Sequence, residues 1–168
     1  AWELDHYFPN PVFKTLFRPA FAYLKRWDYH AAQRPDVMLA VSGFIAQKIR
    51  QNYGRTASVL YPPVEYERFF YDRRLTSAPD RPSYYLAAGR LMHYKRFALL
   101  VEAFLELGLN LWIVGAGPEL PRIQQLAAGA KNIRFIHFAP DHELHELYSG
   151  AKAFLFPQVE DFGLVAAE

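Results

Sequence analysis

The sequence contains no cysteine and only two methionines, and its apolar runs are short. Without cysteine, the chain can form neither a disulfide nor a thiolate metal site. Runs such as Leu111–Val114 are only a few residues long, whereas a helix that spans a bilayer needs about 20 apolar residues. The first residues also lack the charged segment and apolar stretch of a secretory signal. These absences favour a reducing, cytoplasmic setting.

The composition is that of a globular protein. Of the 168 residues, 52% are apolar and 21% are charged, which is enough apolar content to bury a core. The net charge is only +2 and no strongly basic face is evident, so nucleic acid is not an expected partner. The sequence does not begin with Met and stops on the apolar-acidic run 163–168, so we expect it to be a piece of a longer chain.

The segment 8–35 is locally basic and rich in aromatic residues. It carries several lysines and arginines against a single acid, Asp28, with aromatic side chains such as Trp27 between them. One interpretation is an amphipathic stretch that rests on an anionic membrane surface, which would place the protein at the inner face of the membrane. The alternative, favoured over the first, is that the aromatic residues anchor helices against another part of the protein.

Two alternations of strand and helix are predicted, separated by an irregular segment. In the first, residues 36–42 read as a fully buried strand, followed by a helix that stops at Gly54 and a second strand at 58–61. Residues 62–82 have no sustained period. We therefore predict a domain at 1–61, an interdomain connection at 62–82 and a second domain at 83–168.

The second domain shows the pattern of a parallel sheet. Strands are predicted at 84–88, 111–114, 132–138 and 153–156, each followed by a helix. Asp141 is expected to cap the third helix, and the first helix is expected to turn one apolar face inward, made of Leu99, Leu100, Ala103, Phe104 and Leu107. Such alternation predicts an α/β fold with a Rossmann-like, doubly wound parallel sheet, in which ligands bind at the carboxyl ends of the strands.

The loop after the first of these strands has the features of an anion site. Arg90, Lys95 and Arg96 follow Gly89 at the strand terminus. A guanidinium fork and an ammonium group at one helix end can neutralise a diphosphate. The alternative, equally compatible with the sequence, is that these residues are solvated surface cations.

The loop after the fourth strand carries two carboxylates at a suggestive spacing. Glu160 precedes a helix expected to begin near Phe162 or Gly163, and Glu168 lies on that helix. The helix amides favour a phosphate, while the carboxylates can face one ligand, one near a reacting sugar and one on a ribose diol. The alternative is a chance spacing of acids that stabilise the helix dipole.

Several other motifs argue against competing functions. Gly115-Ala116-Gly117 begins like a dinucleotide-binding fingerprint, but Leu120 occupies the third glycine position, so a redox dinucleotide protein is the weakest alternative. The two glycines still permit a ligand to approach the backbone. His142 and His145 lack the spacing of a zinc protease, and no metal site is expected. His137 is expected to be a packed or hydrogen-bonded residue at a sheet edge.

Taken together, the motifs resemble the family 4 retaining glycosyltransferases of GT-B fold, in the style of polysaccharide and lipopolysaccharide mannosyltransferases. The order and spacing agree from about Pro35 to the end. The segments that carry the resemblance are Val41-Ser42, Tyr61-Pro62-Pro63-Val64, Gly89-Arg90-Leu91 with Lys95-Arg96, Ile113 to Glu119, Phe156-Pro157, and Glu160 to Glu168. The resemblance implies an incomplete GT-B architecture, with the end of the N-terminal domain and most of the C-terminal donor-binding domain.

The resemblance also implies a donor site and a reaction. Arg90 and Lys95 would hold the diphosphate of the donor, and Glu160, the first Glu of the E-x7-E motif, would lie by its sugar; these three would be catalytic. Glu168 would bind the ribose hydroxyls. The remaining donor-binding positions implied are Gly115, Gly117, His137, Phe162, Gly163, Leu164 and Val165.

No cofactor or metal is implied by the resemblance. The donor would be a nucleoside-diphosphate sugar, with GDP-mannose favoured, the acceptor a glycan or a lipid-linked glycan, and the anomeric configuration retained. A non-catalytic nucleotide-binding module remains the alternative. Most of the acceptor domain has no counterpart in this sequence, so the segment by itself is expected to be inactive.

Overall fold

The computed structural model describes residues 11–64 and 83–167, which divide into two compact units. The first unit is Ala1–Pro63 and the second is Val64–Glu168. Most of the predicted connection, residues 65–82, lies outside the described residues.

The first unit contains two helices and a short parallel ribbon. In chain order its elements are α2 (Pro11–Ala32), β1 (Leu39–Ala40), α3 (Gly43–Tyr53) and β2 (Ser58–Val59), and β1 pairs with β2 in parallel. The Ser42 side chain accepts a hydrogen bond from the Ile45 amide and so caps the start of α3. Gly54, in the left-handed conformation at φ 67°, ends it. The predicted strand, helix and strand are therefore present.

The prediction of a fully buried strand at 36–42 is wrong. Only Leu39 and Ala40 are in β1, and Ala40 is buried whereas Leu39 is 59% exposed. Val37, outside the strand, is also largely exposed. Successive side chains of a strand point to opposite faces, and within the described residues β1 has one paired strand and one covering helix, α3. Alternate side chains are therefore left uncovered.

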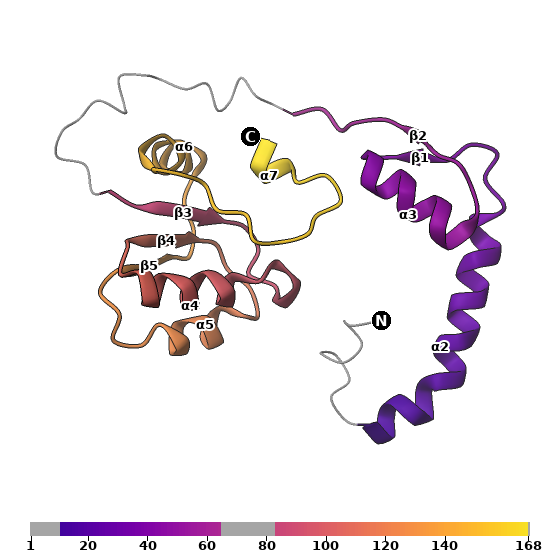
Figure 1. Ribbon diagram of the computed structural model, residues 1–168, viewed down its shortest axis with the longest axis horizontal. Helices are drawn as coiled ribbons and strands as arrows, with labels where there is room; N and C mark the ends of the chain where they lie inside the picture. The colour runs from indigo at the N-terminus through magenta and orange to yellow at the C-terminus, as the bar shows by residue number, and fades with distance from the viewer. Residues whose placement is uncertain (1–10, 65–82, 168) are drawn as a thin grey trace. The chain divides into compact units, whose positions relative to one another are not determined.

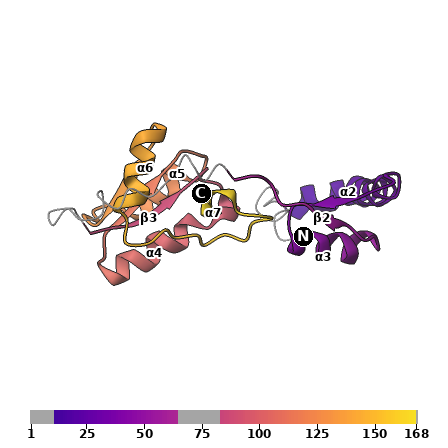
Figure 2. The ribbon, with the colours of Figure 1, turned by 90° about the horizontal axis from the view of Figure 1, so that it is seen from above.

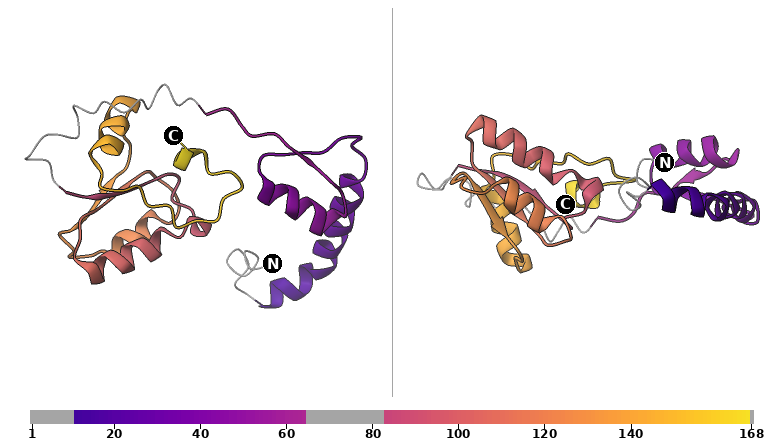
Figure 3. Two further views of the ribbon diagram at one scale, coloured as in Figure 1. Left: turned by 45° about the horizontal axis from the view of Figure 1, so that its top comes forward. Right: turned by 90° about the horizontal axis from the view of Figure 1, so that it is seen from below.

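The C-terminal end of helix α2 contacts the rest of the first unit, and α3 lies beside this end of the helix (Figures 1 and 3). The Tyr53 hydroxyl donates to Asp28 Oδ2 at 2.8 Å, and Arg55 Nη1 donates to the carbonyl oxygens of Ala32 and Pro35 at 3.0 and 2.6 Å. The hydrogen bond to Asp28, with some burial and the carboxylate charge, raises the pKa of Tyr53. Ala32 is the last residue of α2, so its carbonyl group has no hydrogen-bond partner within the helix, and Arg55 supplies one.

The rest of α2 presents apolar side chains to solvent. Within the described residues these include Val12, Leu16, Tyr23, Leu24 and Trp27, each more than half exposed. Neither interpretation of the segment 8–35 is decided by this exposure. None of the described helices is long and apolar enough to cross a membrane.

The second unit is built on a parallel sheet in the order β3-β4-β5. Its strands align Tyr85 with Leu111 and Leu111 with Ile133. In chain order the elements are β3 (Tyr85–Ala88), the 3-10 helix η3 (His93–Lys95), α4 (Phe97–Leu107), β4 (Leu111–Val114), α5 (Leu120–Leu126), β5 (Ile133–Ile136), α6 (Asp141–Gly150) and α7 (Leu164–Ala167).

The predicted fourth strand at 153–156 is reduced to a single parallel bridge between Phe154 and Leu86 of β3. The Leu86 amide donates to the Ala153 carbonyl at 3.0 Å, and the Leu155 amide donates to the Leu86 carbonyl at 2.7 Å. The pairing ends there, close to Pro157, which has no N–H to donate. The sheet nevertheless extends to both sides of β3, with β4 on one side and the Phe154 bridge on the other.

Helices cover both faces of this sheet: α4 and α5 lie on one side and α6 on the other (Figures 1 and 2). Against α4 and α5, Ala87, Leu111 and Ile113 pack in a buried cluster. On the opposite face, Leu86 and Val114 belong to a second cluster, against which side chains of α6 pack. Burying each large apolar side chain stabilises the fold by about 1.5–3 kcal/mol. The predicted α/β fold with a parallel sheet is confirmed.

The inward face of α4 agrees with the predicted one only in part. Leu100, Ala103 and Phe104 pack in or against the buried cluster, as predicted. Leu99 and Leu107 are 53% and 60% exposed, whereas Phe97, Val101 and Phe104 are buried. Helix α4 begins at Phe97, and residues four and seven positions further on share its face. All positions of this 11-residue helix except Glu102 and Glu106 are apolar, so composition alone does not select the buried arc.

Two predictions near β5 and α6 are also corrected. Pro140 occupies the N-cap position of α6, so the helix has no side-chain cap. Asp141 is the first residue of the helix. Its charge there still favours the helix dipole. His137 follows β5 and is exposed, so it is not a packed edge residue.

Candidate functional site

The candidate site lies at the carboxyl ends of β3 and the Phe154 bridge. The chain passes from β3 to β4 and β5 on one side and returns through α6 to pair on the other side of β3. In open α/β sheets, ligands bind at such a reversal of strand order. Three loops leave this edge of the sheet, and we name them the β3 loop (residues 89–96), the β4 loop (residues 115–119) and the switch loop (residues 157–163).

An ion pair joins the β3 loop to the switch loop. Lys95 Nζ lies 3.0 Å from Glu160 Oε1, and the two side chains are 12% and 26% exposed. Their partial burial makes the attraction stronger than that of a fully exposed pair. The sequence placed both residues in one crevice, and the structure brings their charged groups into direct contact.

Arg90 lies in the same loop but is not engaged. Its side chain is exposed and makes no hydrogen bond or ion pair with any of the residues that the structure describes. The adjacent Gly89 has φ 143°, and a Cβ built there would lie 3.7 Å from Lys95 Nζ. Within the described residues, the loop thus offers one paired ammonium group, that of Lys95, and two exposed guanidinium groups, those of Arg90 and Arg96, which have no hydrogen-bond partner. This combination suits a phosphorylated ligand.

The glycines of the β4 loop permit a close approach, but the approaching backbone belongs to the chain itself. A Cβ on Gly115, where φ is 136°, would lie 2.0 Å from the Gly89 carbonyl oxygen. A Cβ on Gly117 would lie 2.4 Å from the Leu91 carbonyl oxygen. The Leu91 amide also donates to the Ala116 carbonyl at 2.9 Å. These glycines therefore position the β3 loop, a role that the fingerprint-like spacing did not indicate.

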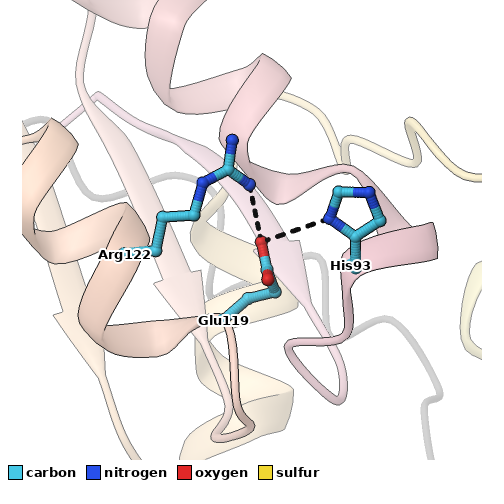
Figure 4. Close-up of polar contacts among 3 residues, drawn as sticks. All are labelled: His93, Glu119 and Arg122. Carbon is cyan, nitrogen blue, oxygen red and sulfur yellow. Dashed lines mark hydrogen bonds and ion pairs between the residues drawn. The ribbon is translucent and has the colours of Figure 1, made fainter. Parts of the chain in front are cut away.

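A further carboxylate connects the two loops, and sequence reasoning assigned it no role. Glu119 Oε2 accepts a hydrogen bond from Arg122 Nη1 at 2.8 Å and lies 3.6 Å from His93 Nδ1 (Figure 4). The Glu119 side chain is only 13% exposed, whereas His93 and Arg122 are about half exposed. The three-residue spacing between Glu119 and Arg122 is a sequence signal for an ion pair at the start of α5. No sequence pattern predicts the contact between Glu119 and His93.

The remaining predicted site residues lie at the ends of other elements. Gly163 precedes α7 with φ 83°, and its carbonyl accepts hydrogen bonds from Ala166 and Ala167. Leu164 and Val165 are the first two residues of α7, and their amides precede those of Ala166 and Ala167, which donate the first hydrogen bonds of the helix. Glu168 lies outside the described residues. Among those described, no three His, Asp or Glu side chains converge to hold a metal ion.

Comparison with known proteins identifies the family. The sequence matches the glycosyl transferases group 1 family over residues 71–168, more than half of the chain. The chain belongs to this family. The search of curated proteins found no match to this sequence.

Solved structures support the fold of this member of the group 1 family. The apo form of the lipopolysaccharide outer core galactosyltransferase WaaB is similar with a TM-score of 0.60 and 21% identity, covering 79% of this chain and 40% of that one. The GtfA/B complex is similar with a TM-score of 0.52 and 21% identity, covering 77% and 27%. The chain thus spans less than half the length of either. The predicted GT-B architecture is confirmed as a partial C-terminal domain, and the redox alternative loses its basis.

Substituting Gly115 tests the packing between the β3 and β4 loops. We expect Gly115→Ala to lower the free energy of unfolding by about 3 kcal/mol, because the new methyl group meets the Gly89 carbonyl and the backbone is unfavourable for alanine. Gly129→Ala is the matched control, since Gly129 also has a positive φ but nothing lies within 4 Å of its Cβ position. It should cost about 1 kcal/mol. Urea unfolding followed by circular dichroism measures both; equal losses would contradict the packing argument.

The pair between Lys95 and Glu160 predicts a salt-dependent contribution to stability. We expect Glu160→Gln to lower the free energy of unfolding by about 1 kcal/mol at low salt, because it leaves a largely buried ammonium group without its partner. The loss should shrink only in part in 1 M salt, because salt screens a largely buried pair less than an exposed one. Glu146→Gln, at an exposed position of α6, is the control and should change neither value. An unchanged free energy of unfolding in Glu160→Gln would argue against the ion pair.

Proposed function

We propose that this chain is part of a glycosyltransferase that moves a sugar from a nucleoside-diphosphate sugar to a glycan or lipid-linked acceptor. The observation that carries the proposal is the contact between Lys95 and Glu160 beside the unengaged Arg90, at the reversal of strand order. Membership of the group 1 family supports the reaction class. The donor would occupy the crevice between the β3 loop and the switch loop.

The charges of this crevice match the chemistry of the leaving group. When the bond between the anomeric carbon and the diphosphate oxygen breaks, the electron pair leaves with the diphosphate, which gains negative charge. Arg90 and Lys95 stabilise that charge more than they stabilise the ground state, which is the condition for lowering a barrier. When the diphosphate binds the Lys95 ammonium group, it replaces Glu160 as the partner of that group. The Glu160 carboxylate can then turn to the donor sugar.

The other assignments follow the same donor orientation. The amides of Gly163, Leu164 and Val165 complete the phosphate site, Phe162 and the β4 glycines border it, His137 lies toward the base and Glu168 binds the ribose hydroxyls. The acceptor hydroxyl attacks from the face that the diphosphate leaves, passes its proton to an oxygen of the departing diphosphate and forms the new bond with retention, as in family 4. Mannose from GDP-mannose is the favoured donor.

The proposed setting is the cytoplasmic side of a membrane. The basic, aromatic segment 8–35, in which apolar side chains such as Leu16 and Trp27 of α2 are exposed, is compatible with contact to an anionic membrane surface, as it is with packing against another part of the protein. A lipid-linked acceptor would be reached from such a position.

Calorimetric titration of the chain with GDP, UDP and NADH tests the donor site. We expect GDP or UDP to bind, and Arg90→Ala and Lys95→Ala each to weaken that binding about tenfold or more, since each removes a charge-assisted hydrogen bond of about 1.5–3 kcal/mol. Lys131→Ala, at an exposed position, is the matched control and should bind like the parent.

Other outcomes separate the remaining possibilities. Binding of NADH alone, or unchanged affinity in both variants, contradicts the proposal. Binding of GDP by the whole enzyme without release of GDP from GDP-mannose favours a non-catalytic nucleotide-binding module.

A further inference from the structure

We infer that Glu119 is a positioning residue, which fixes Lys95 in the crevice through His93 and the short turn that joins these two residues. The inference rests on the proposed function, because it assumes that Lys95 binds the donor diphosphate. It adds a residue that lies outside the loops on either side of the crevice.

The turn that carries Lys95 has an unfavourable backbone. His93–Lys95 form the single 3-10 turn η3, and Arg96, which ends it, has φ 56° and ψ 33°. Arg96 is the one non-glycine residue with a positive φ among those that the structure describes. Side-chain-bearing residues disfavour this left-handed region, and such conformations persist only where the surrounding structure holds them. The turn therefore depends on contacts from outside it.

The ends of the loop are held by packing and backbone bonds. Leu91 and Phe97 are buried, and the Leu91 carbonyl accepts a hydrogen bond from the Glu119 amide at 3.1 Å. These anchors do not need the Glu119 side chain, so its loss should leave the fold intact. They also lie outside the turn itself.

The Glu119 side chain supplies a contact to the turn from the β4 loop. Its Oε2 lies 3.6 Å from Nδ1 of His93, the first residue of η3, while Lys95 is the last. Arg122 donates to the same oxygen at 2.8 Å and so fixes the carboxylate in place. All three side chains are shown in Figure 4. Because the carboxylate is largely shielded and its partners are half exposed, it is the centre of this cluster.

Glu119 thus complements Glu160. Glu160 contacts the ammonium group of Lys95 directly, whereas Glu119 acts on the backbone turn from which that side chain extends. Weakening the contact between Glu119 and His93 allows the turn η3 to relax from its unfavourable geometry. The Lys95 ammonium group then moves away from the position of the diphosphate. The expected consequence is a loss of ligand affinity that exceeds any loss of stability.

A double-mutant cycle with GDP as the probe tests this role. We expect Glu119→Gln to raise the Kd for GDP about three- to fivefold, the range for a partly shielded polar contact between side chains. Because Glu119 acts through Lys95, Glu119→Gln should cause no further loss in the Lys95→Ala background. Glu106→Gln, an exposed position on α4, is the matched control for the charge and should leave the Kd unchanged. Thermal unfolding of each variant reports any loss of fold.

His93→Ala keeps the test decisive if Glu119→Gln unfolds, because it removes the nitrogen that faces Glu119 and leaves Arg122 paired with Glu119. It should raise the Kd to a similar extent. The positioning role alone is overturned if Lys95→Ala weakens binding while Glu119→Gln and His93→Ala do not. It is also overturned if Glu119→Gln costs as much affinity in the Lys95→Ala background as in the parent chain. Unchanged binding in Lys95→Ala overturns the donor site and this inference with it.

Discussion

The arrangement of the site depends on the position of β3 between two parallel neighbours. Pairing with β4 on one side and with Phe154 on the other brings the ends of segments distant in the sequence to one edge of the sheet. The β3 loop and the switch loop both leave from that edge, and the contact of Lys95 with Glu160 follows from it. Without this reversal of strand order, the cations and the carboxylate would be separate features of the surface.

The β3 loop owes its shape to neighbours rather than to its own sequence. Gly115 and Gly117 allow the β4 loop to lie directly against its backbone, and the Glu119 side chain approaches the strained turn before Arg96. Buried packing by α4 and α5 on one face of the sheet holds both loops at the strand ends. The core and the site are therefore connected through the backbone of two adjacent loops.

Much of the fold, and less of the site, could be predicted from the sequence. Strand β4 was predicted with its observed bounds because Leu111–Val114 is a short apolar run between turn residues. The exposure of Leu99 and the shortness of the strand at Phe154 could not be predicted, because they depend on which neighbours cover each face. The location of Lys95 and Glu160 followed from strand-end reasoning. The role of Glu119 did not, since its contact with His93 arises only when two loops fold against each other.

A crystal structure of the chain with GDP bound tests the donor site most directly. We expect diphosphate oxygens to lie about 3 Å from Lys95 Nζ and from the Arg90 guanidinium, and the Glu160 carboxylate to have moved away from the ammonium group. A diphosphate bound elsewhere on the second unit, with Lys95 still paired to Glu160, would contradict this expectation.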